Sequence, residues 1–318
     1  MTLLQAMITM IRGCRWLALA LLLAPAALAL AACATTAKQT TTSPEQTVIA
    51  TFYPLQYLAQ RIGGDRVEAT SLVPPGVEPH DFEPSPQDMA AVQRADLFLY
   101  NGAGLEPWAA RVVAALPANG PATVKATQGL TLLNTAGNGE NKESQDPHVW
   151  LDPGLYAQQA QIVRDALAKI DPSGVAIYDA NLAKLKADMK ELEDEIEKGL
   201  RSCARDTIVT SHSAFAYLAE RFGLRQLALA GLSPEVQPSP ARMKEIVQEV
   251  RATGATHVFF ESLTTPAVAQ AVARETGSKT LALNPLEGLT QDQLRAGEDY
   301  FTIMRRNLAN LRMALACQ

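Results

Sequence analysis

Three of the four histidines in this 318-residue chain lie in short segments where their side chains could bind one metal ion together. His80 is in the segment Glu-Pro-His-Asp-Phe-Glu-Pro, His148 in Asp-Pro-His-Val-Trp-Leu-Asp-Pro and His212 in Thr-Ser-His-Ser-Ala-Phe. Neutral imidazole is the commonest protein ligand of metals such as Zn²⁺, and three imidazoles with one carboxylate complete a tetrahedral shell. Singly, each histidine fits a surface or hydrogen-bonded role. Together, they predict a metal site.

The three segments stand at or just beyond the ends of predicted strands. Loops at the carboxyl ends of the strands of an open α/β sheet converge on one crevice, so these loops are expected to meet. Prolines beside His80 and His148 restrict the backbone and leave these side chains little conformational entropy to lose. The fourth histidine, His257, stands at the entry of an apolar strand, and we interpret it as structural.

Apolar, β-branched stretches alternate with helical patterns along both halves of the chain. The alternation predicts an α/β protein of two lobes, each a parallel sheet covered by helices on both faces. Predicted strands are 47–52, 67–73 and 96–100 in the first half and 207–210, 226–228, 257–261 and 280–283 in the second. One predicted helix ends at 63–64, and a further helix is predicted after residue 149. The other predicted helices span 85–94, 214–222, 240–254, 266–277 and about 298–316.

Between the halves, apolar residues recur at a spacing of three and four from Val175 to Leu200. This pattern predicts one helix over 173–202, roughly 45 Å long. A coiled-coil dimer is the competing explanation. We favour a stripe packed along both lobes of a monomer, because four heptads flanked by α/β lobes need no second chain.

The N-terminal segment has the pattern of an export signal. Arg12 and Arg15 precede an apolar run from Trp16 to Leu30, and the tetrapeptide Leu-Ala-Ala-Cys ends at Cys33. The run is shorter than the ~20 residues that span a bilayer. The tetrapeptide resembles a bacterial lipobox, in which the cysteine receives the lipid and becomes the mature N-terminus. An ordinary secretory signal cleaved nearby is the alternative.

These signals predict a domain organisation and leave one pair of cysteines. The predicted segments are a lipoprotein signal peptide (1–32), the lipidated cysteine with a flexible tether (33–46), a first α/β lobe (47–172), a linking helix (173–202) and a second α/β lobe (203–318). Cys203 and Cys317 remain after processing, and an oxidising compartment favours a disulfide between them over two independent thiols. The bond would contribute on the order of 4 kcal/mol in the chain-entropy model.

The composition is that of a globular protein, with 47% hydrophobic and 19% charged residues. A formal net charge of -5 argues against nucleic acid as a partner and gives no sign of a basic membrane-binding face. We therefore expect contact with the membrane through the lipid anchor alone.

The motifs around the three histidines, with Phe-Tyr-Pro-Leu at 52–55 and Leu-Asn-Pro-Leu-Glu at 283–287, resemble those of a known family. The chain looks like the metal-binding receptors of bacterial zinc and manganese importers of the ATP-binding-cassette (ABC) type, the TroA-like cluster A-I group. The match covers nearly the whole chain from about Thr47. The resemblance implies two α/β lobes joined by one long rigid helix, with the metal held between the lobes.

The resemblance assigns His80, His148 and His212 as ligands. Many relatives place an acid in the loop after the last strand, where this chain offers Glu287 and Asn284. We choose Glu287, because an Asn carbonyl is a much weaker zinc ligand than a carboxylate; Asn284 or water is the alternative. Glu261, at the end of another strand, is a candidate for supporting the ligands or adding a minor contact.

Manganese-type relatives usually carry two histidines and two carboxylates, so the third histidine favours Zn²⁺ over Mn²⁺ or Fe²⁺. The polar stretch 134–146 holds no histidine, unlike the histidine-rich loop of many zinc members, and is predicted to be a surface loop. The resemblance implies an extracytoplasmic, lipid-anchored receptor whose partners are an importer permease and its ATPase. Rival interpretations are a zinc hydrolase, although no His-Glu-x-x-His helix is present, and a metal-binding adhesin.

Overall fold

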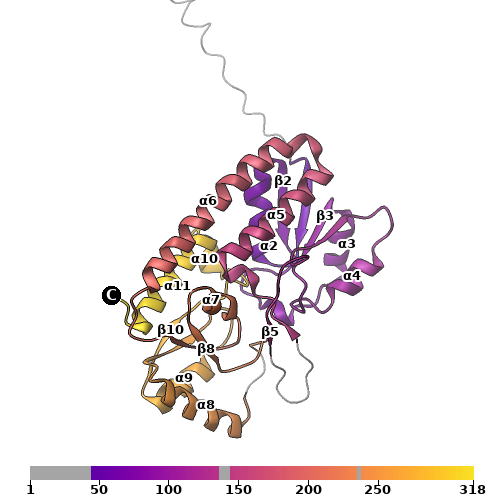
Figure 1. The fold of residues 1–318 in the computed structure, drawn as a ribbon. Coiled ribbons are helices and arrows are strands. Elements are labelled where there is room, and N and C mark those ends of the chain that lie inside the picture. Colours follow the sequence, from indigo (N-terminus) through magenta and orange to yellow (C-terminus); the bar gives the residue numbers. More distant parts are fainter. Residues whose placement is uncertain (1–43, 136–143, 235–237) are drawn as a thin grey trace, which may run out of the picture. The chain divides into compact units, whose positions relative to one another are not determined.

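A computed structural model describes residues 44–135, 144–234 and 238–318 of the chain. Its first lobe is built on the parallel sheet β2-β1-β3-β4 (Figure 1). The strands are β1 (Gln46–Ala50), β2 (Val67–Ser71), β3 (Leu97–Tyr100) and β4 (Ala122–Lys125). The covering helices are α2 (Tyr53–Gly63), α3 (Pro86–Arg94), α4 (Ala109–Ala115) and α5 (Pro153–Ile170).

The strands of this sheet are buried on both faces. Val48 and Leu97 face the core that α2 and α5 share, whereas Ile49 and Phe98 face α3 and α4. This division follows from the two-residue period of a strand, which sends successive side chains to opposite faces. The prediction of a sheet covered on both sides is therefore confirmed for this lobe.

The second lobe repeats the design on the parallel sheet β10-β9-β7-β8. Its strands are β7 (Thr207–Thr210), β8 (Arg225–Ala228), β9 (His257–Phe260) and β10 (Lys279–Ala282). Helices α8 (Pro240–Thr253) and α9 (Ala267–Thr276) pack on one face, and α7 (Ala216–Arg221) and α11 (Tyr300–Leu315) lie on the other. In each lobe the first strand lies between the second and third, and the fourth lies beyond the third.

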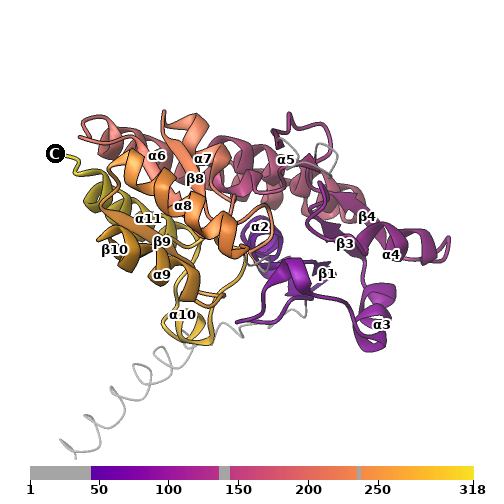
Figure 2. The ribbon, with the colours of Figure 1, turned by 90° about the horizontal axis from the view of Figure 1, so that it is seen from below.

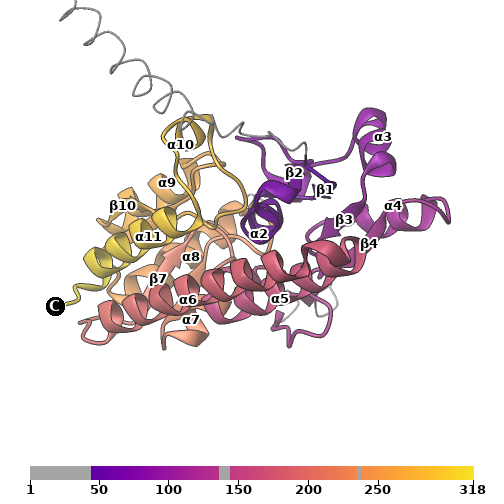
Figure 3. The ribbon, with the colours of Figure 1, turned by 90° about the horizontal axis from the view of Figure 1, so that it is seen from above.

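One long helix, α6 (Val175–Leu200), connects the lobes and runs beside α5 and α2 in the first and α11 in the second (Figures 2 and 3). Its buried residues are Tyr178, Leu182, Leu185, Met189, Leu192, Ile196 and Leu200. They belong to a core that continues through both lobes, so the predicted apolar stripe packs within the chain. The α-helix begins at Val175 because residues 172–174 form a tighter 3₁₀ turn.

The sequence missed several short elements. They are α4, β4, α10 (Gln291–Arg295), the small antiparallel pair β5 (Asn134–Thr135) and β6 (Ser144–Gln145), and the 3₁₀ turns η1 (Gly64–Arg66), η2 (Pro79–Asp81), η3 (Val149–Leu151) and η4 (Pro172–Gly174). Their length leaves too few turns or alternations for a periodic signal. The pair β5–β6 gives the predicted surface loop a paired base.

The C-terminal end of the chain is tied to the end of α6 by a disulfide between Cys203 and Cys317, as predicted. The predicted signal peptide, lipidated Cys33 and nearly all of the predicted tether lie outside the described residues. No helix in the described part of the chain is both long and apolar enough to cross a membrane.

Candidate metal centre

His80 is carried by the 3₁₀ turn η2, on a loop that follows the edge strand β2. Glu78 caps this turn, since its Oε1 accepts a hydrogen bond from the His80 backbone N–H at 3.2 Å. Pro79 between them fixes the backbone at the first turn position. The His80 side chain is 8% exposed, and its Nε2 points at the other candidate ligands.

His148 immediately precedes η3 and is completely buried. Oδ1 of Asp146 accepts from its backbone N–H at 2.9 Å and lies 2.7 Å from its ring Nδ1. A carboxylate at this distance holds the proton on Nδ1 and leaves Nε2 free to bind a metal. The Asn101 amide also donates to the Pro147 carbonyl at 3.0 Å, which fixes the chain just before the histidine.

His212 lies two residues beyond β7 and is also completely buried. Oε1 of Glu261 lies 2.7 Å from its Nδ1 and accepts from its backbone N–H at 3.2 Å. Glu261 directly follows β9, so two strand ends of one sheet supply the histidine and the carboxylate that orients it. Glu261 thus contacts the ring of a proposed ligand directly.

Glu287 projects from the loop after β10. The preceding residue, Leu286, is buried and has a positive φ of 59°, an uncommon and strained conformation for a leucine. The Asn284 side-chain oxygen accepts from the Leu286 N–H at 2.7 Å, and its amide donates to Ser262 at 2.7 Å. Asn284 therefore holds the turn that aims Glu287.

The ligand atoms of His80, His148, His212 and Glu287, called here the His–Glu cluster, all lie within 4.8 Å of one another. His148 Nε2 is 3.3 Å from His80 Nε2, 3.4 Å from His212 Nε2 and 3.0 Å from Glu287 Oε1. Glu287 Oε1 is 3.3 Å from both remaining Nε2 atoms. A tetrahedral shell with bonds of ~2.0–2.1 Å has ligand separations of about 3.3 Å, so five pairs match that spacing.

The electrostatics of the cluster favour a bound cation. Burial alone would lower the pKa of His148, but Asp146 and then Glu287 raise it. Burial likewise opposes charge on His212, yet the carboxylates of Glu261 and Glu287 raise its pKa well above the ordinary value. The pKa of Glu287 is held well below its usual range because the surrounding imidazoles outweigh its burial.

Four buried carboxylates each keep one oxygen without a hydrogen-bond partner in the described residues. They are Glu78, Asp146, Glu261 and Glu287. Burial and the neighbouring Glu287 carboxylate raise the pKa of Glu78 to about 9. No Lys or Arg of the described residues forms an ion pair with any of the four. The adjacent histidines are the counter-charges of Asp146, Glu261 and Glu287, and a dication bound by the cluster would take over that role.

Sequence reasoning missed the roles of Asp146 and Glu78, although both residues lie in motifs that it used. Both occupy the first position of an acid-Pro-His tripeptide, and both accept the N–H of the histidine two residues later. That repeated tripeptide is the signal that could have identified them. His257 lies at the entry of β9, away from the cluster, with its Nδ1 3.0 Å from the Thr256 hydroxyl.

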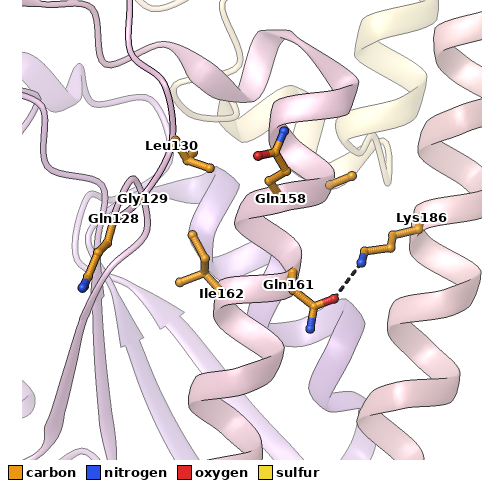
Figure 4. A pocket seen from close by; sticks show the side chains of 8 residues that line it. Gln128, Gly129, Leu130, Gln158, Gln161, Ile162 and Lys186 are labelled. Carbon is orange, nitrogen blue, oxygen red and sulfur yellow. Dashed lines mark hydrogen bonds between the residues drawn. The ribbon is translucent and has the colours of Figure 1, made fainter.

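A hollow of about 440 Å³ lies elsewhere, between the 128–130 turn, α5 and α6 (Figure 4). Its charged group is Lys186, whose Nζ donates to Gln161 Oε1 at 2.7 Å. The lining contains no histidine, cysteine or carboxylate, so this hollow has no set of metal ligands.

Two parallel-sheet lobes, one connecting helix and a buried group of three histidines and a glutamate define the TroA-like class of metal-binding proteins. The chain belongs to the family described as zinc-uptake complex component A (ZnuA), whose model matches residues 48–314.

Named relatives agree with this assignment. The zinc-binding protein AdcA of Streptococcus pyogenes is 34% identical over 297 residues, covering 88% of this chain and 58% of the relative, so the chain spans little more than half of that protein. The high-affinity zinc uptake system protein ZnuA of Bacillus subtilis is 33% identical over 279 residues, covering 84% and 87%.

Solved structures give the same result. The zinc-bound ZnuA-like domain of Streptococcus pneumoniae AdcA is 34% identical with a TM-score of 0.75, covering 85% of this chain and 99% of that domain. The laminin-binding protein Lmb of Streptococcus agalactiae, described as having adhesin and metal-transporting activity, is 33% identical with a TM-score of 0.76 and the same coverage.

Proposed function

We propose that this chain is an extracytoplasmic receptor that captures Zn²⁺ between its two lobes and delivers it to the permease of an ABC importer. The observation that carries the proposal is the convergence of three imidazole nitrogens and one carboxylate oxygen within 4.8 Å. His80, His148, His212 and Glu287 are the proposed ligands. The relatives named as zinc-binding or zinc-uptake proteins support the same cargo.

The donor set favours zinc over manganese or iron. Three nitrogen donors and one oxygen suit Zn²⁺, whereas Mn²⁺ prefers carboxylate, carbonyl and water oxygens. The carboxylates on the Nδ1 atoms of His148 and His212 strengthen this preference, because they raise the basicity of the nitrogens that face the metal. A Mn²⁺ or Fe²⁺ receptor of the same family is the alternative.

The same geometry supports a receptor rather than a zinc hydrolase. Catalytic zinc keeps a position open for water, whereas four protein ligands close the shell. Three of the four proposed ligands are completely buried, and His80 is nearly so.

For capture, the carboxylates of Asp146, Glu261 and Glu287 attract the cation, and the imidazoles replace its water. Two ligands come from each lobe, so separation of the lobes breaks the shell. Docking on the permease would therefore release the ion if it forces the lobes apart. The remaining parts of the proposal are a lipid anchor at Cys33, a monomeric receptor, and a permease and ATPase as partners.

The test is a chelator-competition titration of the wild-type protein with Zn²⁺ and Mn²⁺, together with the metal content of the protein as purified. We expect one Zn²⁺ per chain and much weaker binding of Mn²⁺. Tighter binding of Mn²⁺ than of Zn²⁺, or no tight binding of either ion, would refute the proposal.

A further inference from the structure

A tyrosine of the second lobe forms hydrogen bonds with both segments of the antiparallel pair that lies just before His148. Strands β5 and β6 pair with Asn134 opposite Gln145, which places Leu133 opposite Asp146 at the base of the hairpin. Asp146 N–H donates to the Leu133 carbonyl at 2.8 Å. In an antiparallel ladder such a pair exchanges two hydrogen bonds. Here the second bond, from the Leu133 N–H to the Asp146 carbonyl, is replaced by hydrogen bonds to a side chain.

The Tyr217 hydroxyl occupies the place of that second bond. It accepts from the Leu133 N–H at 2.9 Å and donates to the Asp146 carbonyl at 2.8 Å. Tyr217 is 4% exposed and belongs to α7, five residues beyond His212. One hydroxyl thus joins the chain that leads to His148 in the first lobe to the segment that carries His212 in the second.

The main-chain position of Asp146 matters because its carboxylate has no other support among the described residues. Its Oδ1 contacts both the backbone N–H and the ring Nδ1 of His148, whereas its Oδ2 is buried without a partner. With one oxygen unanchored, the direction of the carboxylate depends on where the backbone of Asp146 is held. The Tyr217 hydroxyl fixes that backbone by donating a hydrogen bond to the Asp146 carbonyl.

We propose that Tyr217 is a positioning residue of the metal site. Through the Asp146 main chain it fixes the carboxylate that orients the His148 ring, and it makes the placement of His148 depend on the second lobe. The inference rests on the proposed function, since its effect is on the affinity for Zn²⁺. A purely structural hydroxyl would instead contribute to folding and leave the metal untouched.

The experiment is the substitution Tyr217→Phe, which keeps the ring and removes the hydroxyl. We expect Zn²⁺ binding about tenfold weaker, at the low end of the ~10–100-fold cost of losing an orienting partner. The matched control is Tyr156→Phe, because Tyr156 is also buried and donates to a backbone carbonyl, that of Pro54 at 2.7 Å, outside the site. The control is expected to lower the melting temperature of the metal-free protein without changing Zn²⁺ affinity.

Two further measurements separate positioning from a loss of stability. In Co²⁺-loaded protein, Tyr217→Phe should shift the visible absorption bands of the metal, and the control should not. In an Asp146→Ala background, Tyr217→Phe should weaken Zn²⁺ binding no further, because the two residues act in series.

Unchanged Zn²⁺ affinity and an unchanged Co²⁺ spectrum in Tyr217→Phe would overturn the inference, and so would additive losses in the double variant. If the wild-type protein itself binds no Zn²⁺, the proposed function fails instead, which distinguishes the two failures.

Discussion

The two lobes share one strand order but present the residues of the proposed metal site differently. In the second lobe, His212 and Glu261 stand one or two residues beyond β7 and β9, and Glu287 follows β10 closely. In the first lobe, His80 lies in the 3₁₀ turn η2, nine residues beyond β2, and His148 lies between the short strand β6 and the turn η3, outside the main sheet. The second sheet therefore positions His212 and its orienting carboxylate directly, whereas both proposed ligands of the first lobe, like Glu287 in the second, lie on loops that need separate support.

The residue just beyond the third strand makes the contrast sharper. In the second lobe it is Glu261, whose carboxylate binds the His212 ring directly. In the first lobe it is Asn101, which contacts the carbonyl of Pro147 rather than the His148 ring. The His148 ring is instead oriented by Asp146, which lies in the same loop as His148. Equivalent fold positions thus support the histidines by different routes.

Removing a ligand is expected to have the largest effect, and a greater one in the second lobe. His212→Ala or Glu287→Ala should weaken Zn²⁺ binding by more than the ~100-fold upper cost of losing an orienting group. His80→Ala should cost less, because His80 lies nine residues beyond β2, farther from a strand end than His212 or Glu287. Competition titration measures all three, with His257→Ala as a control that should bind like the wild type. A greater loss in His80→Ala would reverse the comparison.

The disulfide lies in the second lobe, and its removal is expected to change the stability of the protein rather than its affinity for metal. Cys203 and Cys317 are 114 residues apart and join the end of α6 to the end of α11. Replacing both by serine should lower the free energy of unfolding by about 2–4 kcal/mol. Zn²⁺ affinity of the folded variant should stay unchanged. Denaturant unfolding of the metal-free protein checks the first part, and equal midpoints for variant and wild type would contradict it.

The orienting acids should have similar effects in both lobes. Asp146→Ala and Glu261→Ala are each expected to weaken Zn²⁺ binding ~10–100-fold, because the ring they orient loses its fixed direction and part of its basicity. Asp146→Asn and Glu261→Gln keep an acceptor oxygen and should lose less. Titration of the four variants tests the comparison. A loss confined to one lobe would show that the two histidines are not oriented alike.

Much of this architecture could be predicted from the sequence, because its signals are local. The apolar stripe of α6 and the alternation of strands and helices are periodic, and the caps at Ser85 and Gly254 are short-range. The three histidines of the proposed metal site could be selected because each lies in a distinctive turn segment. The resemblance to a family then assigned all three as ligands.

The roles that escaped prediction depend on tertiary contacts. Nothing local shows that Leu286 has a positive φ, or that Asn284 uses its side chain to hold that turn. The Tyr217 hydroxyl joins residues 71 and 84 positions away. The short β4 and α4 lack a periodic signal, so their positions follow from the sheet and not from their own sequence.

Proton competition with Zn²⁺ is expected at higher pH for His148 and His212, one histidine from each lobe, than for a free histidine. Since Asp146 and Glu261 raise the pKa values of His148 and His212, protons remain on these rings at a higher pH than on a free histidine. Zn²⁺ affinity should be full above the raised pKa values and fall as the pH drops through them. The fall should begin above ~6.5, at about tenfold per pH unit for each proton displaced. Titrations between pH 8 and 5.5 test this, and a flat profile would contradict it.

The smallest expected effect concerns Asn101, the first-lobe counterpart of Glu261. Asn101→Ala removes the bond to the Pro147 carbonyl but leaves the His148–Asp146 contact, so Zn²⁺ affinity should fall less than tenfold. Thr127→Val is the matched control, because the Thr127 hydroxyl bonds the Asn101 carbonyl at 2.6 Å without contacting Pro147.

Thr127→Val should cost about 1 kcal/mol of stability, and Asn101→Ala should cost more, because it also leaves the buried Gln159 amide without its acceptor. Only Asn101→Ala should also change affinity. If its loss equals that of Glu261→Ala, the first lobe depends on its third-strand residue as much as the second lobe does. The contrast between direct and loop-borne support would then be wrong.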